Sequence, residues 1–135
     1  MNIVVAGGGK LGANLAVNMK AAGHEVIVIE QLASRVERLR ELHPDLHVVH
    51  GDACEPVILE TAHIRRAHAV AAVTGDDEDN LVVCLLARRE YDVATTAARI
   101  NDPRNEWLFS EQFGVDHTVS STSMMTEILT REVGS

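Results

Sequence analysis

The hydrophobic positions of the chain follow two alternating patterns. Short continuous apolar runs, rich in Val, Ile and Ala, predict strands that are buried on both faces; they lie at residues 2–6, 25–30, 46–50, 69–74, 93–100 and 115–119. Between them, apolar residues recur at helical spacing, which predicts helices at residues 10–22, 33–42, 56–62, 75–90, 103–113 and 120–133. This strand–helix alternation indicates an α/β protein with a Rossmann-like, doubly wound, six-stranded parallel sheet.

Length and charge narrow the function classes. The 135 residues fit one domain. The net charge of −8 and an aromatic content of 3 % argue against a nucleic-acid partner, which would need basic and stacking surfaces. The chain starts without a basic leader and contains no membrane-length apolar run, so we expect a cytoplasmic protein.

Cys54 and Cys84 suggest no disulfide framework, and we expect both to pack as small apolar residues rather than to act as a redox sensor.

A glycine-rich turn joins the first predicted strand to the first predicted helix. It reads Gly7-Gly8-Gly9-Lys10-Leu11-Gly12, a GxGxxG pattern. In that context Gly7 makes the tight turn, Gly9 lets the backbone approach a diphosphate, and Gly12 lets the helix pack on the strand. The diphosphate would bind the free N–H groups of the helix N-terminus. The alternative is a plain glycine turn in an α/β protein.

Polar residues follow three of the predicted strands, at the edge where α/β proteins bind ligands. Glu30 ends the second strand, where an acid accepts the ribose hydroxyls and disfavours NADP; otherwise it is a solvent-exposed acid. Asp52, with the backbone of Ala53, is placed to contact adenine, or else forms a turn. Thr74 and Gly75 are placed to reach the ribose, or else cap the next helix.

Several charged residues near these positions permit two interpretations. Lys10 would supply a positive charge to a phosphate, or lie in solvent. Arg99, on a predicted buried strand, needs a partner, either a ligand phosphate or an acid such as Asp76. The acidic residues from Asp76 to Asp79 are explained by helix capping and the helix dipole, with a divalent-cation site as the less favoured reading. The histidines show no metal-ligand spacing, so we predict no metal site.

No catalytic set accompanies these features. The chain has no Tyr-x3-Lys pair and no nucleophile elbow, and no length remains for a substrate domain. Two hypotheses follow. The first is a regulatory module that binds a nucleotide without turning it over; the second is the cofactor-binding half of an NAD-dependent oxidoreductase. The first is favoured, so we expect a protein that is not an enzyme.

The same motifs, in the same order, resemble the RCK N-terminal domain, which is also called KTN or TrkA-N. The matching stretches cover residues 1–12, 26–30, 48–52, 72–80, 98–100 and 113–117. The resemblance implies a regulatory subunit of a Trk/Ktr-type potassium uptake system or the gating ring of a potassium channel. Such a subunit senses NAD(H) or ATP/ADP and acts on a membrane-embedded partner at the inner face of the membrane.

Carried over by position, the resemblance implies a nucleotide site of Gly7 to Leu11, Glu30, Asp52 with Ala53, Thr74 with Gly75, and Arg99. In this resemblance, a basic residue at position Lys10 favours ATP or ADP as the ligand without excluding NAD. Two departures stand out. Ser121-Thr122 occupies the place where many relatives have Pro-Glu, so a cation contact by that acid is lost. The usual C-terminal RCK subdomain is absent, from which we expect a truncated chain.

The last predicted helix carries an apolar stripe of Met124, Met125, Ile128, Leu129 and Val133. We divide the chain into a nucleotide-binding domain, residues 1–120, and a C-terminal crossover helix, residues 121–135. In a lone monomer the stripe would pack on the sheet. In the resembling family this helix crosses to another subunit, which implies a homodimer, or a larger ring, through residues 121–133.

Overall fold

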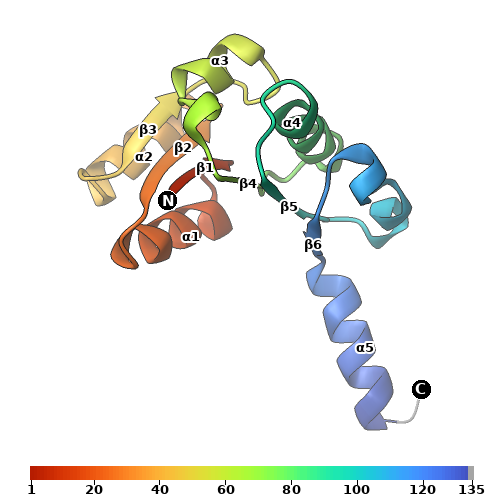
Figure 1. The fold of residues 1–135 in the computed structure, drawn as a ribbon. Coiled ribbons are helices and arrows are strands. Elements are labelled where there is room, and N and C mark those ends of the chain that lie inside the picture. Colours follow the sequence, from red (N-terminus) through yellow and green to blue (C-terminus); the bar gives the residue numbers. More distant parts are fainter. Residues whose placement is uncertain (134–135) are drawn as a thin grey trace.

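The computed structural model describes residues 1–133 and contains one sheet of six parallel strands (Figure 1). The strands are β1 (Asn2–Ala6), β2 (Glu25–Glu30), β3 (His47–His50), β4 (Ala69–Ala72), β5 (Thr95–Arg99) and β6 (His117–Val119). Their order is β3-β2-β1-β4-β5-β6. The chain therefore builds outward from β1 to one edge, crosses back, and builds from β4 to the other edge. The predicted doubly wound α/β fold is confirmed.

Helices cover both faces of this sheet because alternate strand residues point to opposite sides. Ile3 and Val5 of β1 pack with α1 (Lys10–Ala21) and α2 (Ala33–Leu42) on one face. Val4 and Ala6 belong to the core of the other face. That core is closed by α3 (Pro56–Thr61), the short 3₁₀ helix η1 (Ile64–Arg66) and α4 (Asp77–Arg89). Apolar burial on both sides explains why the inner strands contain few polar residues.

The segment after β5 differs from the prediction. An α-helix over residues 103–113 is wrong: the structure has two 3₁₀ helices, η2 (Pro103–Leu108) and η3 (Glu111–Phe113). The N–H group of Asp102 and the side chain of Asn105 bind the carboxylate of Asp77, and Phe109 turns into the core. These contacts hold the segment against α4 and interrupt a regular helix. The strand β6 is also shorter than predicted, and all its residues are exposed.

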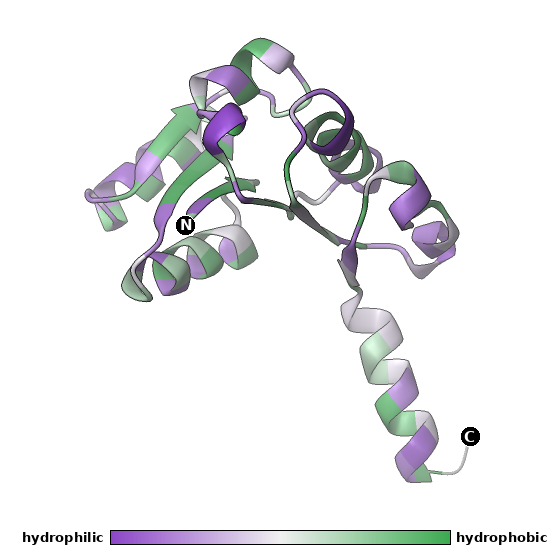
Figure 2. Ribbon diagram, in the orientation of Figure 1, coloured by the Kyte–Doolittle hydropathy of each residue, from purple (hydrophilic) through white to green (hydrophobic). Residues whose placement is uncertain are grey.

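The last helix, α5 (Ser121–Val133), projects away from the sheet (Figure 1). None of its residues is buried, and the side chains of its apolar stripe are 41–74 % exposed. Figure 2 shows these apolar positions alternating with polar ones along the free helix. The expectation for a lone monomer, that the stripe packs on its own sheet, is therefore wrong. The helix is fixed at its start, where the hydroxyl of Ser120 accepts a hydrogen bond from Ser123 N–H at 3.2 Å.

Candidate functional site

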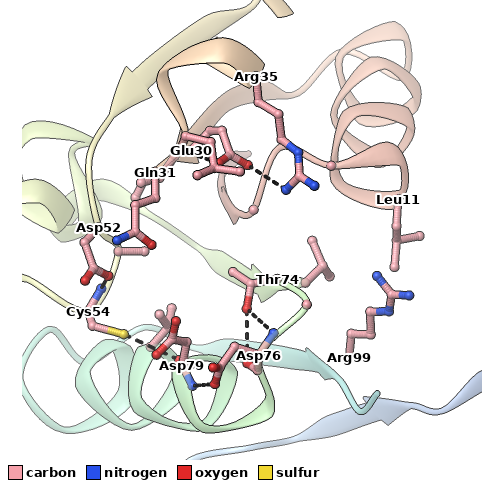
Figure 3. Close-up of a pocket in the computed structure, with 18 of the residues that line it drawn as sticks. Leu11, Glu30, Gln31, Arg35, Asp52, Cys54, Thr74, Asp76, Asp79 and Arg99 are labelled. Atoms are coloured by element: carbon pink, nitrogen blue, oxygen red, sulfur yellow. Dashed lines mark hydrogen bonds and ion pairs between the residues drawn. The ribbon is translucent and has the colours of Figure 1, made fainter. Parts of the chain in front are cut away.

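A cleft of about 400 Å³ opens at the carboxyl edge of the sheet, between the parallel strands β1 and β4, whose following connections lead to opposite edges of the sheet (Figure 3). This is the position at which doubly wound sheets bind ligands. Its walls include all the predicted binding residues except Gly8 and Gly12, namely Gly7, Gly9, Lys10, Leu11, Glu30, Asp52, Ala53, Thr74, Gly75 and Arg99. Residues that the sequence separates by more than 90 positions thus line one cavity.

The glycines of the turn have different tasks. Gly7 has a φ of +112°, which favours glycine, and a side chain there would lie 2.9 Å from the backbone nitrogen of Thr74. A Cβ on Gly12 would overlap the carbonyl oxygen of Gly7, so Gly12 keeps α1 close to β1 and faces away from the cleft. Gly9 precedes the first residue of α1 and has only Arg35 near its Cβ position, at 3.7 Å. Phosphate oxygens therefore have room beside Gly9 and the N-terminus of α1.

Glu30 is held in a fixed position at the end of β2. Its side chain is 5 % exposed, so the alternative of a solvent-exposed strand-end acid is wrong. One carboxylate oxygen accepts the N–H of Gly8 at 2.9 Å, and the other accepts the N–H of Leu32 at 2.7 Å. Two oxygens with about four acceptor sites between them leave room for two further hydrogen bonds. The carboxylate is therefore held in one position and keeps acceptor sites for a ligand.

A turn between β3 and α3 brings Asp52 and Cys54 to the cleft. One oxygen of Asp52 accepts the N–H of Cys54 at 2.9 Å, which bears out the turn-forming role of this acid. Asp52 also lines the cleft beside buried Ala53, so the turn contact does not remove it from the cleft. Cys54 lies in the turn before α3 and is partly exposed, yet it packs against the apolar core as expected; Cys84 is fully buried in α4. Burial, with the nearby carboxylates of Asp79 and Asp52, raises the pKa of Cys54 to about 12.

A buried amide on α4 fixes the ends of β4 and β5. The side chain of Asn80 is 0 % exposed; its oxygen accepts the N–H of Thr74 at 3.0 Å and the hydroxyl of Thr74 at 2.6 Å. Its NH₂ group donates to the carbonyl oxygens of Thr74, at 3.0 Å, and Arg99, at 2.9 Å. All of its hydrogen-bonding capacity is therefore used to position two residues that line the cleft. The Thr74 hydroxyl also accepts the N–H of Asp76, a turn contact.

The acidic residues at the start of α4 do not act alike. Asp76 caps the helix by accepting the N–H of Asp79 at 3.0 Å, as the capping explanation predicts. Asp77 is buried and accepts hydrogen bonds from Asn101, Asp102 and Asn105. Burial by itself raises the pKa of Asp77, but these hydrogen bonds outweigh it and hold the pKa below its usual value. Burial and the neighbouring carboxylates of Asp76 and Asp52 raise the pKa of Asp79.

Charged groups of both signs line the cleft. The acids Asp52, Asp76 and Asp79 come from the turn after β3 and the start of α4, while Glu30 lies beside Arg35 at the end of β2 and the start of α2 (Figure 3). The cations Lys10 and Arg99 come from the start of α1 and from β5. Within residues 1–133, no carboxylate lies within 4 Å of the charged group of Lys10 or Arg99. The cleft therefore has cations that a phosphate can reach, and the proposed Asp76 partner for Arg99 is not observed.

Sequence reasoning missed Arg35, Asn80 and Cys54. Arg35 is the third residue of α2, and its guanidinium lies 3.7 Å from the carboxylate of Glu30. Its position five residues after the strand-end acid, in the first turn of the next helix, was the available signal. Asn80 carried no signal, because a buried amide within a helix looks like any polar helical residue.

None of the helices within residues 1–133 is long and apolar enough to cross a membrane.

Known proteins share the sequence pattern of this chain. The model of the TrkA-N domain matches residues 3–121. The Trk system potassium uptake protein TrkA of Mycobacterium tuberculosis is 38 % identical over 133 residues, which are 98 % of this chain and 60 % of that protein. The chain therefore spans about 60 % of this relative's length.

Solved structures show the same architecture. The TrkA-N domain of the inner membrane protein ybaL from Escherichia coli superposes with a TM-score of 0.83 over 96 % of this chain and 94 % of that one, at 20 % identity, which supports the fold. The structure of GsuK bound to ADP has a TM-score of 0.78 at 29 % identity, over 95 % of this chain and 32 % of that one. Because the family model covers nearly the whole of the described structure, the chain belongs to the TrkA-N domain family.

Proposed function

We propose that this chain is the nucleotide-binding part of a regulatory subunit that controls a membrane-embedded potassium transporter or channel. The ligand is an adenine nucleotide, ATP/ADP or NAD(H), bound in the cleft at the carboxyl edge of the sheet. The observation that carries the proposal is the convergence of the glycine turn, the preorganised Glu30 and the reachable cations Lys10 and Arg99 in one cavity. Binding shifts the packing of the chain against its partners rather than starting a reaction.

The parts of an adenine nucleotide match the parts of the cleft. The N-terminus of α1 and Lys10 suit the phosphates. The free acceptor sites of Glu30 suit the ribose hydroxyls, and Asp52 with Ala53 borders the place for adenine. Thr74, Gly75 and Arg99 close the other side. The related GsuK structure, by its name, holds ADP, which supports this ligand class.

The proposal of a potassium-transporting partner rests on the names of the related proteins. The Mycobacterium tuberculosis protein is named for potassium uptake, and the match includes nearly all of the present chain. We propose that this chain acts at the inner face of the membrane through such a transporter, in the cytoplasm, and that its role is regulation without catalysis. The match to the TrkA-N domain and the potassium-uptake names of the relatives favour this role over that of an oxidoreductase half.

Calorimetric titration with ATP, ADP, NAD and NADH tests the ligand class. We expect ATP and ADP to bind, and Lys10→Ala to weaken ATP binding about tenfold, because it removes a charge-assisted contact to a phosphate. Lys20→Ala, at the other end of α1, is the matched control and leaves affinity unchanged. If none of the four nucleotides binds, the cleft is not a nucleotide site. Tighter binding of NADH that Lys10→Ala does not change, together with turnover of NADH, would favour the oxidoreductase hypothesis.

The exposed stripe of α5 supports a second part of the proposal, a homodimer through residues 121–133. Each chain would cover five apolar side chains that are now 41–74 % exposed, and this burial favours association. Ile128→Glu should raise the dimer dissociation constant more than about tenfold, because burying an isoleucine contributes about 1.5–3 kcal/mol and the interface contains it twice.

Light scattering across a concentration series measures this change. Thr130→Glu is the matched control, since it adds the same charge on the opposite face of α5. A wild-type chain that stays monomeric at every concentration contradicts the dimer. Equal dissociation by both variants would mean that the stripe is not the interface.

A further inference from the structure

A second groove, of about 440 Å³, lies between the start of α1 and the side of α2 that faces it. Its charged and titratable lining residues are Lys10, Arg35, Arg38 and His43, and no acidic residue borders it. The whole chain has 20 acidic and 12 basic residues, so an all-basic groove is a local exception. No carboxylate of residues 1–133 lies within 4 Å of the Arg38 guanidinium. The groove therefore suits an anion.

This groove joins the nucleotide cleft at its ribose end. Gly9, Lys10 and Arg35 border both cavities. Arg35 leans from α2 toward Glu30, as Figure 3 shows, with its nitrogen 3.7 Å from the carboxylate oxygen. That distance is an ion pair without a hydrogen bond, so all five N–H donors of the guanidinium stay available. Arg35 is also half exposed and has room to reorient.

We infer that the basic groove is a subsite for a phosphate on the 2′-oxygen of the ribose, so that the cleft accepts 2′-phosphorylated adenine nucleotides as well as unphosphorylated ones. The inference rests on the proposed nucleotide site and extends it. A ribose held at Glu30 directs its 2′-oxygen toward the boundary where the cleft and the groove meet. A phosphate there lies between Arg35 and Arg38, which form bidentate contacts with phosphates.

The charge of Glu30 alone opposes such a phosphate, which is why the sequence pattern disfavours NADP. The structure changes this balance in two ways. Arg35 offsets the charge of Glu30 through the ion pair, and Glu30 already directs hydrogen-bonding capacity to the N–H groups of Gly8 and Leu32. With Arg38 and Lys10 also bordering the groove, the local charge around a 2′-phosphate is positive.

The test compares two probes that differ only by this phosphate: adenosine 5′-monophosphate and adenosine 2′,5′-bisphosphate. We expect the bisphosphate to bind at least as tightly as the monophosphate in calorimetric titration. Arg38→Ala and Arg35→Ala should each lower the preference for the bisphosphate about tenfold, since each removes a charged contact. Arg65→Ala removes an exposed cation from η1, on the opposite face of the sheet, and should leave the preference unchanged.

Each outcome decides one of the two proposals. Binding of the bisphosphate at least tenfold more weakly than the monophosphate overturns the subsite and leaves the nucleotide site standing. Equal binding that neither arginine variant changes also overturns the subsite, because the phosphate then points elsewhere. Binding of neither probe overturns the subsite, and it overturns the nucleotide site as well where ATP, ADP, NAD and NADH also fail to bind. Circular dichroism of each variant confirms that the fold is kept, and Arg38, exposed on α2, is the variant least tied to folding.

Discussion

Gly12→Ala is expected to destabilise the fold by about 3 kcal/mol or more. The added methyl group would overlap the carbonyl oxygen of Gly7 and lie 2.9 Å from its carbonyl carbon. Both are backbone atoms of the turn that joins β1 to α1, so no side-chain rotation relieves the contact. The helix has to move off the strand, which also displaces the N–H groups that we propose for phosphate binding. Chemical denaturation measures the loss, and titration with ADP measures the accompanying loss of affinity.

Gly75→Ala is the matched control for this variant. A Cβ at Gly75 meets no atom within 4 Å, and the residue does not need a positive φ. Its free energy of unfolding should stay within about 0.5 kcal/mol of the wild type. A Gly12→Ala protein as stable as Gly75→Ala would show that α1 packs less tightly on β1 than the structure indicates.

Asn80→Ala is expected to have the second largest effect, a loss of about 2–4 kcal/mol. The substitution leaves the carbonyl oxygen of Arg99 without the Asn80 donor and the N–H of Thr74 without its acceptor, at a site that is 0 % exposed. The carbonyl oxygen of Thr74 loses one of two donors and keeps the hydrogen bond from the Asn101 side chain. Unpaired polar groups of this kind are costly because they have given up water without a replacement. Adenine nucleotide affinity should fall as well, because Thr74 and Arg99 both border the cleft.

Denaturation of Asn80→Ala beside Asn18→Ala isolates the effect of the network. Asn18 is exposed on α1, and its side chain makes no hydrogen bond within the described residues, so its loss should change stability little. Equal stabilities for the two variants would contradict the role of Asn80. Asn80→Asp is a sharper probe, since it places a carboxylate oxygen against two carbonyl oxygens and should be at least as destabilising as the alanine variant.

The strand and helix pattern was predictable because the inner strands are buried on both faces. Such strands are nearly continuous apolar runs, which are easy to recognise in a sequence. The hydrophobic pattern predicted the structure less well in segments that are less buried. The strand β6 is fully exposed and shorter than expected, and the segment after Pro103 bends to satisfy Asp77. Its shape depends on a carboxylate more than 20 residues earlier in the chain, and no local periodicity carries that information.

The candidate site also contains features that the sequence predicts and features that it does not. The glycine turn, Glu30 and the strand-end residues were predictable because their positions follow from the topology of the sheet. The hydrogen bonds of Glu30 to the glycine turn and the fixing of Thr74 by Asn80 were not, because they join residues through tertiary packing. Arg99 illustrates the boundary: its need for a partner was predictable, while the lack of an acid within 4 Å of it in residues 1–133 required the structure.

The helix α5 gives the chain a mechanical lever. Its 13 residues rise about 1.5 Å each, so the helix is about 20 Å long. Its base follows β6, whose Val119 carbonyl accepts the N–H of Ile100, next to Arg99 of the cleft. A tilt of about 10° at that base moves the far end by about 3 Å, given this length. A displacement too small to disturb the sheet therefore becomes, at the tip of α5, a movement comparable to half a helical turn.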